Sequence, residues 1–239
     1  MIRLGVTGTD TGVGKTVIAV ALLSMLRRRG LRVAAMKPVE TGVLPGAQTD
    51  AARLLAAAGA EDRLDDVGPL AYAEALAPLV AAGRAGRPVH VDTLDVVLGR
   101  LAAKRDAIVV EGAGGLLVPL TEEVSYATLF ARWRLGLVIV AANRLGAINH
   151  VLLTVQAARA AELQVRGVVV NDGAGTVADL ATATNAAALA RLLPGVPVLT
   201  WPRLTDTSDD ALGVQAERLG LGRLIVPTST PLNTMERTT

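Results

Sequence analysis

The stretch GTDTGVGKT at residues 8–16 constrains the fold of this chain more than any other feature of the sequence. It follows an apolar run at residues 2–7 and precedes a helical pattern over residues 15–29. A glycine-rich turn between a strand and a helix directs backbone N–H groups and the positive end of the helix dipole toward one point, which suits a phosphate group. The usual phosphate loop has a glycine, four residues and then Gly-Lys-Ser/Thr, and here Thr9 stands where the first glycine is required.

Short apolar runs alternate with longer helical patterns along the rest of the chain. The runs are LRVAAMKP (31–38), AIVVEG (107–112), GLVIVAAN (136–143), VRGVVVND (165–172) and VPVLTWP (196–202). This alternation predicts an α/β protein in which helices flank a parallel sheet. With the glycine-rich loop, we expect a single domain of the P-loop NTPase type over residues 1–226 and a flexible tail over residues 227–239. Residues 43–88 predict one helix near 50–58, followed by loops.

Composition excludes several classes of function. The net charge is +2 and aromatic residues make up 2% of the chain, which argues against a nucleic-acid binder. The absence of cysteine excludes disulfides and thiolate sites and is consistent with a cytoplasmic protein. We expect no membrane association, because the sequence has neither a signal-peptide pattern nor an apolar run of about 20 residues.

Chemically distinctive residues follow the apolar runs, where ligands bind in open α/β sheets. Lys15 would supply charge to a phosphate, and the Thr16 hydroxyl would bind Mg²⁺. Lys37 would emerge at the same sheet edge, where an ammonium can offset charge on a transferring phosphoryl group, although a solvated lysine is an equal alternative. Glu111 ends a buried run, and a carboxylate there is costly unless it is paired or bound to metal. Asp50 suits a helix cap better than a ligand on spacing alone.

These motifs together resemble the dethiobiotin synthase family, whose members are ATP-dependent carboxylases of biotin biosynthesis. The resemblance covers nearly the whole chain and rests on GTDTGVGKT (8–16), KPVETG (37–42), TD (49–50), PLVAA (78–82), VVEGAGGLLVPL (109–120), LGAINH (145–150) and VVND (169–172). The unusual spacing of the phosphate loop is similar to that family's own form.

The resemblance implies roles for particular residues of this chain. It implies Lys37 and Lys15 as catalytic residues, and Mg²⁺ held by Thr16, Asp50 and Glu111. It implies substrate contacts from Lys37, Thr41 and Asn149. It implies ATP contacts from Gly12, Val13, Gly14, Lys15, Thr16, Val17, Asp50, Glu111, Gly112, Ala113, Gly114, Asn171, Asp172, Pro202, Arg203 and Leu204. Glu40 and Arg203 stand at positions where this sequence departs from the family's usual residues.

The resemblance also implies a reaction and an assembly. The substrates are 7,8-diaminononanoate, CO₂ or bicarbonate, and ATP, and the substrate site lies at the interface of a homodimer. The diamine takes up CO₂ as a carbamate, ATP phosphorylates the carbamate to a carbamic-phosphoric anhydride, and the second amine closes the ureido ring of dethiobiotin, leaving ADP and phosphate.

The main alternative is a partitioning or site-selection ATPase, a nucleotide-gated switch of related fold. Such switches carry a second lysine early in the phosphate loop, and this chain has Asp10 at that position. Ring-forming ligases related to cobyrinate amidation are a further alternative, but they carry a glutaminase domain with a nucleophilic cysteine, which this sequence lacks.

Overall fold

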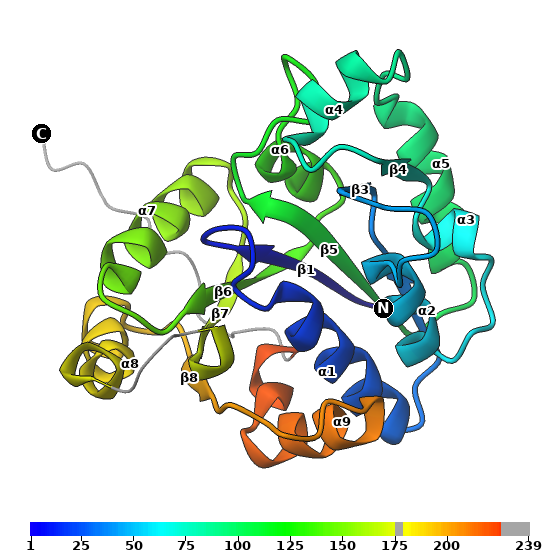
Figure 1. Ribbon diagram of the computed structural model, residues 1–239. Coiled ribbons are helices and arrows are strands. Elements are labelled where there is room, and N and C mark those ends of the chain that lie inside the picture. Colours follow the sequence, from blue (N-terminus) through cyan, green and yellow to red (C-terminus); the bar gives the residue numbers. More distant parts are fainter. Residues whose placement is uncertain (175–178, 226–239) are drawn as a thin grey trace, which may run out of the picture.

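A six-stranded parallel sheet forms the centre of the computed structural model, which describes residues 1–174 and 179–225 (Figure 1). Every strand pair in this sheet is parallel. The order across the sheet is β2 (Val33–Met36), β5 (Ala107–Gly115), β1 (Ile2–Gly8), β6 (Gly136–Ala142), β7 (Val165–Asn171) and β8 (Val198–Trp201). The six apolar runs of the sequence therefore form the six strands, which confirms the predicted fold class.

Helices cover both faces of the sheet (Figure 1). The connection from β1 to β2 runs in the opposite direction along the sheet to all later connections, so right-handed crossovers place its helix on the opposite face from the helices that lead into β5, β6, β7 and β8. One face carries α1 (Lys15–Arg28), α2 (Asp50–Ala58) and α9 (Asp209–Arg218). The other carries α5 (Val91–Ala102), α6 (Tyr126–Arg132), α7 (Ala147–Ala160) and α8 (Leu180–Leu192). Among the described residues, no helix has the length and apolar character needed to cross a bilayer.

The segment after α2 contains more regular structure than the sequence predicts. The helix expected near residues 50–58 is present, but the residues expected as loops include α3 (Leu64–Val67), β4 (Leu70–Tyr72) and α4 (Pro78–Arg84). Strand β4 pairs in parallel with β3 (Val39–Thr41) to form a separate two-stranded sheet. These elements are too short to show a hydrophobic period. Two 3₁₀ helices, Asp172–Ala174 and Leu221–Leu224, complete the described structure. The tail predicted at 227–239 lies outside the described residues.

Helix α1 lies at the centre of the core. Residues 18–26 of this helix are all buried, because the sheet covers one side and α2 and α9 cover the other. A helix that is apolar on all sides is expected in such a position. Gly213 of α9 permits the close approach of α9 to α1, since a Cβ atom there would lie 2.9 Å from the Cβ atom of Ser24.

Two glycine substitutions test this packing. In Gly99→Ala, the new methyl group points into open space on an exposed part of α5, so the free energy of unfolding should rise by about 0.5–1 kcal/mol through better helix propensity. In Gly213→Ala the same gain should be outweighed by overpacking, which costs about 1–3 kcal/mol. Urea unfolding followed by circular dichroism measures both. Equal stabilisation by the two substitutions would contradict the close packing of α9 on α1.

Candidate active site

The phosphate loop joins β1 to α1 and is held in place by the end of β7. Gly14 caps α1 in a left-handed conformation with φ 95°, and a Cβ atom there would lie 2.2 Å from Nδ2 of Asn171. The Asn171 amide donates a hydrogen bond to the Val13 carbonyl at 2.9 Å and accepts one from the Gly173 N–H at 2.9 Å. Glycine is therefore required at position 14 both for its conformation and for the approach of Asn171.

Lys15 is buried at the start of α1, although its side chain carries a charge. Its Nζ donates to the backbone carbonyl of Asp10 at 3.0 Å, so the side chain folds back along the loop. Burial, together with the nearby charge of Lys37, lowers the pKa of Lys15 to about 8. An anion in the loop would meet a partly desolvated ammonium, and electrostatic attraction is stronger there than in water.

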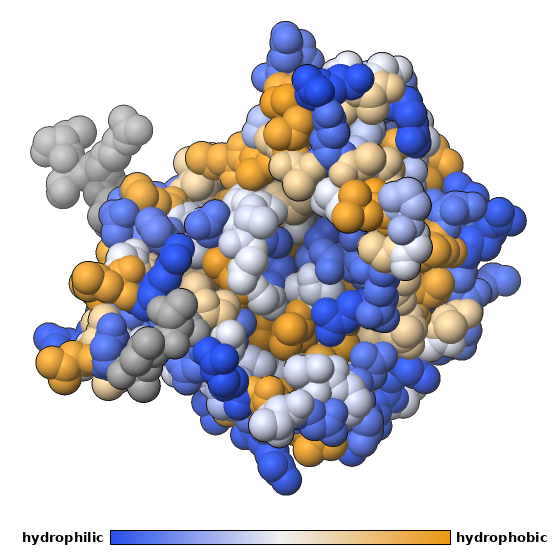
Figure 2. All heavy atoms as spheres, in the orientation of Figure 1, coloured by the Kyte–Doolittle hydropathy of each residue, from blue (hydrophilic) through white to orange (hydrophobic). Residues whose placement is uncertain are grey.

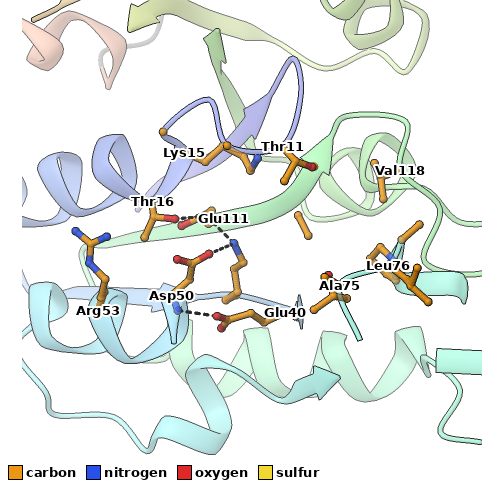
Figure 3. A pocket seen from close by; sticks show the side chains of 18 of the residues that line it. Thr11, Lys15, Thr16, Glu40, Asp50, Arg53, Ala75, Leu76, Glu111 and Val118 are labelled. Carbon is orange, nitrogen blue, oxygen red and sulfur yellow. Dashed lines mark hydrogen bonds and ion pairs between the residues drawn. The ribbon is translucent and has the colours of Figure 1, made fainter. Parts of the chain in front are cut away.

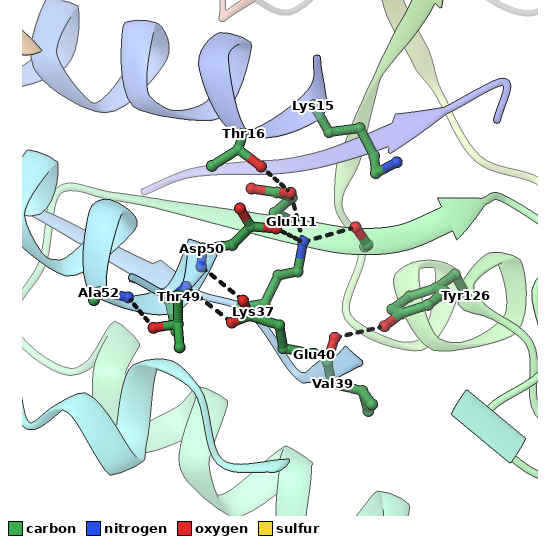
Figure 4. Close-up of polar contacts among 12 residues, drawn as sticks. Lys15, Thr16, Lys37, Val39, Glu40, Thr49, Asp50, Ala52, Glu111 and Tyr126 are labelled. Carbon is green, nitrogen blue, oxygen red and sulfur yellow. Dashed lines mark hydrogen bonds and ion pairs between the residues drawn. The ribbon is translucent and has the colours of Figure 1, made fainter. Parts of the chain in front are cut away.

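Lys37 lies at the centre of a group of buried and partly buried polar side chains, which we call the Lys37 cluster: Lys37, Thr16, Asp50 and Glu111 (Figure 4). The Lys37 Nζ lies 2.6 Å from Oε1 of Glu111 and 2.9 Å from Oδ2 of Asp50, and Thr16 donates to the same Glu111 oxygen at 2.9 Å. Lys37 and Glu111 are 3% and 1% exposed. The alternative of a solvated Lys37 is therefore wrong, and four residues named from the sequence lie together.

The charges of the Lys37 cluster depend on one another. Burial alone would lower the pKa of Lys37, but Glu111 and Asp50 outweigh that effect and raise the pKa above its ordinary value. Burial would raise the pKa of Asp50, yet the neighbouring ammonium holds it below the usual value. Burial raises the pKa of Glu111 even beside Lys37. Lys37 is thus a charged residue that lines the same cavity as the phosphate loop.

The Lys37 cluster has the donor set of a magnesium site that is completed by a nucleotide. Oε2 of Glu111 is buried and has no hydrogen-bond partner within the described residues, so it remains available to a cation. Mg²⁺ commonly binds one or two carboxylates together with phosphate oxygens and water. The described part of the chain contains no group of three or more acidic, histidine or cysteine side chains suited to a metal, so phosphate oxygens and water would complete the coordination.

Asp50 is not the cap of α2. Thr49 precedes the helix and its hydroxyl accepts the Ala52 N–H at 3.0 Å, which makes Thr49 the capping residue. Asp50 is the first residue of the helix, and its carboxylate contacts Lys37. Spacing alone favoured Asp50 as the helix cap, and this interpretation is wrong, because the cap is Thr49, one residue earlier.

A cavity of about 720 Å³ lies in front of the phosphate loop and the Lys37 cluster (Figure 3). Asp50, Glu111 and Thr16 line one side, and Ala75, Leu76 and Val118 line the opposite side. The other lining residues are Thr11, Gly12, Gly14, Lys15, Val17, Lys37, Glu40, Thr41, Arg53, Ala77, Pro78, Ala113 and Gly114. Figure 2 shows hydrophilic and hydrophobic side chains together in the hollowed centre of this face. The cavity thus combines a charged wall with an apolar wall.

A second cavity, of about 270 Å³, lies on the other side of the phosphate loop. It shares Gly12, Gly14 and Val17 with the first cavity, so the two adjoin along the loop. The residues that line it beyond these three are Asn171, Gly173, Ala174, Trp201, Pro202, Arg203, Leu204, Thr207 and Leu212. The segment Pro202–Leu204, for which the resemblance implies ATP contacts, therefore lies beside the loop.

Some of the residues named from the sequence line neither cavity. Asp172 accepts a hydrogen bond from Asn143 at 2.6 Å, and Asn149 is exposed on the first turn of α7. Gly112 contacts the site through its carbonyl, 3.5 Å from Nζ of Lys37, and Val13 through the carbonyl that Asn171 holds. Residues 75–77 were not found from the sequence, because an Ala-Leu-Ala segment carries no chemical signal.

The chain is similar to a protein family, to relatives of known name and to solved structures. The family described as "AAA domain" matches residues 3–203. An ATP-dependent dethiobiotin synthetase BioD of an Anaeromyxobacter species is 42% identical over 206 residues, covering 86% of this chain and 92% of that protein. A nucleotide-binding protein of Archaeoglobus fulgidus, solved with ADP, is similar in fold with a TM-score of 0.54 at 17% identity, covering 90% of this chain and 88% of that one. The septum site-determining protein MinD of Pyrococcus horikoshii, solved with Mg-ADP, gives 0.52 at 14% identity, covering 94% and 99%.

The charge balance of the Lys37 cluster can be tested by a pair of substitutions. In Lys37→Met, without nucleotide or metal and near pH 7, the free energy of unfolding should fall by about 3–5 kcal/mol, because Glu111 loses its buried counter-charge. Adding Glu111→Gln should recover most of the loss, since Gln keeps the shape without the charge. Urea unfolding of both variants measures this.

The pH dependence of Lys37→Met provides the control. A buried carboxyl with a raised folded-state pKa adds stability below its unfolded pKa and loses it as the pH rises through the folded pKa. The defect should therefore be smaller near pH 5 than near pH 7. Equal losses in the single and double variants would contradict the assigned charge balance.

Proposed function

The chain belongs to the ATP-dependent dethiobiotin synthetase family, and we propose that it is the ligase that closes the ureido ring of dethiobiotin in biotin biosynthesis. The observation that carries the proposal is the buried Lys37 ammonium, which is fixed by two carboxylates at the junction of the phosphate loop and the large cavity. A fixed positive charge at that point can stabilise negative charge both on a phosphoryl group and on the carbamate that accepts it.

The proposed reaction converts 7,8-diaminononanoate, CO₂ and ATP to dethiobiotin, ADP and phosphate. One amine adds to CO₂ and loses a proton to give a carbamate. A carbamate oxygen attacks the γ-phosphorus and the bond to the ADP oxygen breaks, which gives a carbamic-phosphoric anhydride. The second amine then attacks the carbamoyl carbon, phosphate leaves, and the amine loses a proton as the ring closes.

The residues of the chain contribute chiefly by position and charge. The backbone N–H groups of the loop and the start of α1 face the phosphates, and Lys15 supplies a positive charge beside them. Lys37 lies between the loop and the substrate cavity, where it would offset negative charge on the carbamate and on the transferring phosphoryl group. Phosphoryl transfer requires little covalent participation by the protein, so these fixed charges would supply most of the rate enhancement of the proposed reaction.

Thr16, Asp50 and Glu111 are the residues that would hold Mg²⁺. When bound, Mg²⁺ would neutralise oxygens of the triphosphate. Thr16 and Glu111 are hydrogen-bonded, and Lys37 contacts both carboxylates, so the protein's own groups define the geometry of the site before any cation arrives.

We assign the two walls of the large cavity to different parts of the diamine. Lys37 lies on the polar side and, with Thr41 of the cavity lining, would face the reacting amines, whereas Leu76 and Val118 would pack on the alkyl chain. Asn149 is exposed on α7, outside both cavities, which agrees with a role across the interface of a homodimer. Its place near the start of α7 suits a substrate carboxylate, because backbone N–H groups there favour an anion.

The second cavity is the proposed site of the nucleotide base. Pro202, Arg203 and Leu204 form part of its wall, and Asn171 connects it to the loop. Asp172 is held by Asn143, so we assign Asp172 to shaping the end of β7 rather than to direct contact with the base.

No observation favours the alternative of a nucleotide-gated switch. The likeness to MinD is at 14% identity and shows the fold alone. Asp10 stands at the position where such switches carry a lysine, and its carboxylate pairs with Arg144 at 3.5 Å.

The proposed activity predicts a defined product and a specific defect. The purified protein with the diamine, bicarbonate, Mg²⁺ and ATP should form dethiobiotin, detected by mass spectrometry. Lys37→Gln keeps a hydrogen-bond donor near Glu111 but removes the charge, so turnover should fall by about 100-fold or more. A thermal unfolding curve checks that the variant is folded. Wild-type turnover by folded Lys37→Gln would refute the role of Lys37, and no product from the unsubstituted protein would refute the function.

A further inference from the structure

Glu40 is a buried acidic residue that contacts the start of α2. It lies in β3, three residues after Lys37, and its side chain points toward the first turn of α2 (Figure 4). Its Oε1 accepts the backbone N–H of Asp50 at 2.7 Å, and its Oε2 accepts that of Ala51 at 3.1 Å. Within the described residues, Glu40 forms no ion pair, and its carboxylate accepts hydrogen bonds from these two N–H groups.

The start of α2 receives its hydrogen bonds from two different side chains. The first N–H groups of a helix have no partner within the helix. Thr49, the local cap, satisfies the Ala52 N–H, and Glu40 satisfies those of Asp50 and Ala51 from a distant strand. A carboxylate at this end of a helix is also favoured by the helix dipole. Thr49 thus performs the ordinary capping function, and Glu40 attaches the helix to β3.

This attachment determines where the carboxylate of Asp50 lies. Residues 42–49, which connect β3 to α2, form neither helix nor strand. Glu40 spans this loop directly and binds the backbone of Asp50, whose side chain lies 2.9 Å from Lys37. Lys37 precedes Glu40 on the same segment. The hydrogen bond that Glu40 accepts therefore holds the Asp50 carboxylate beside the Lys37 ammonium, which also contacts Glu111.

We propose that Glu40 is a positioning residue, which holds Asp50 in the geometry needed to bind Mg²⁺ with the nucleotide. The proposal rests on the metal role given to Asp50 in the proposed function. Groups that orient metal ligands commonly change metal affinity by about 10–100-fold when they are removed. Glu40 acts through Asp50 and not by contact with the reacting atoms.

The test measures nucleotide binding, independently of turnover. Isothermal titration calorimetry with ADP over a series of Mg²⁺ concentrations gives the concentration of half-maximal Mg²⁺-dependent binding. In Glu40→Gln, one acceptor oxygen becomes an amide NH2 group, a donor that faces a backbone N–H donor, so this concentration should rise by about 10-fold. The matched control is Thr49→Ala, which removes the cap of the same helix. It should lower the unfolding midpoint by about 2–4 °C and leave the Mg²⁺ dependence unchanged.

Two results would overturn the proposal. One is an unchanged Mg²⁺ dependence in Glu40→Gln. The other is an equal change in Thr49→Ala, which would show that any weakening of the helix start has this effect. If Glu40→Gln does not fold, Glu40→Asp retains the carboxylate with a shorter reach and should shift the Mg²⁺ dependence in the same direction. An unchanged dependence in folded Glu40→Asp would equally contradict the proposal.

Asp50→Asn separates this inference from the metal assignment on which it rests. If Asp50→Asn raises the Mg²⁺ requirement and Glu40→Gln does not, the role of Glu40 is wrong and the metal role of Asp50 stands. If Asp50→Asn has no effect, the metal role itself is wrong. In the combined variant, Glu40→Gln should add little to Asp50→Asn because both act on the same ligand, and full additivity would count against the proposal.

Discussion

The site depends on the ion pair between Lys37 and Glu111, both of which are almost fully removed from water. Removing two charges from water is costly, and their attraction compensates for the cost when additional hydrogen bonds satisfy them. Asp50 and the Gly112 carbonyl provide further contacts to Lys37, and Thr16 provides one to Glu111. Lys37, Thr16, Asp50 and Glu111 come from different parts of the chain, so the ion pair also fixes how β5, α1, α2 and the end of β2 meet.

The phosphate loop has a second attachment, to Asn171 at the end of β7. Asn171 binds the Val13 carbonyl and leaves no space for a side chain at position 14. The loop is thereby connected to β7 on one side and, through Thr16, to the Lys37 cluster on the other. The two cavities adjoin along this loop, so a nucleotide spanning them would contact a prearranged surface, which reduces the cost of ordering on binding.

The sequence predicted the features that depend on local pattern or on an unusual residue. Every residue of β6 is buried, so its apolar run is typical of a central parallel strand. Glu111 follows the apolar residues 107–110 but lies inside β5, which continues to Gly115, and a buried carboxylate in such a strand indicates a functional partner. The state of Lys37 could not be predicted, because its burial depends on contacts with residues 13 and 74 positions away. Thr49 and Asp50 are both good caps, so spacing could not choose between them. The elements between residues 64 and 84 are stabilised by long-range contacts and are too short for periodicity.

The chemistry assigned to the Lys37 cluster requires that an oxygen atom of the carbon substrate attack the γ-phosphorus. The most direct measurement supplies ¹⁸O-labelled CO₂ with the diamine, Mg²⁺ and ATP for a short reaction time and analyses the inorganic phosphate by mass spectrometry. We expect the phosphate formed together with dethiobiotin to carry one ¹⁸O atom transferred from the labelled CO₂. Phosphate without label, formed in equal amount to dethiobiotin while the remaining CO₂ is still labelled, would contradict attack by a carbamate oxygen on the γ-phosphorus.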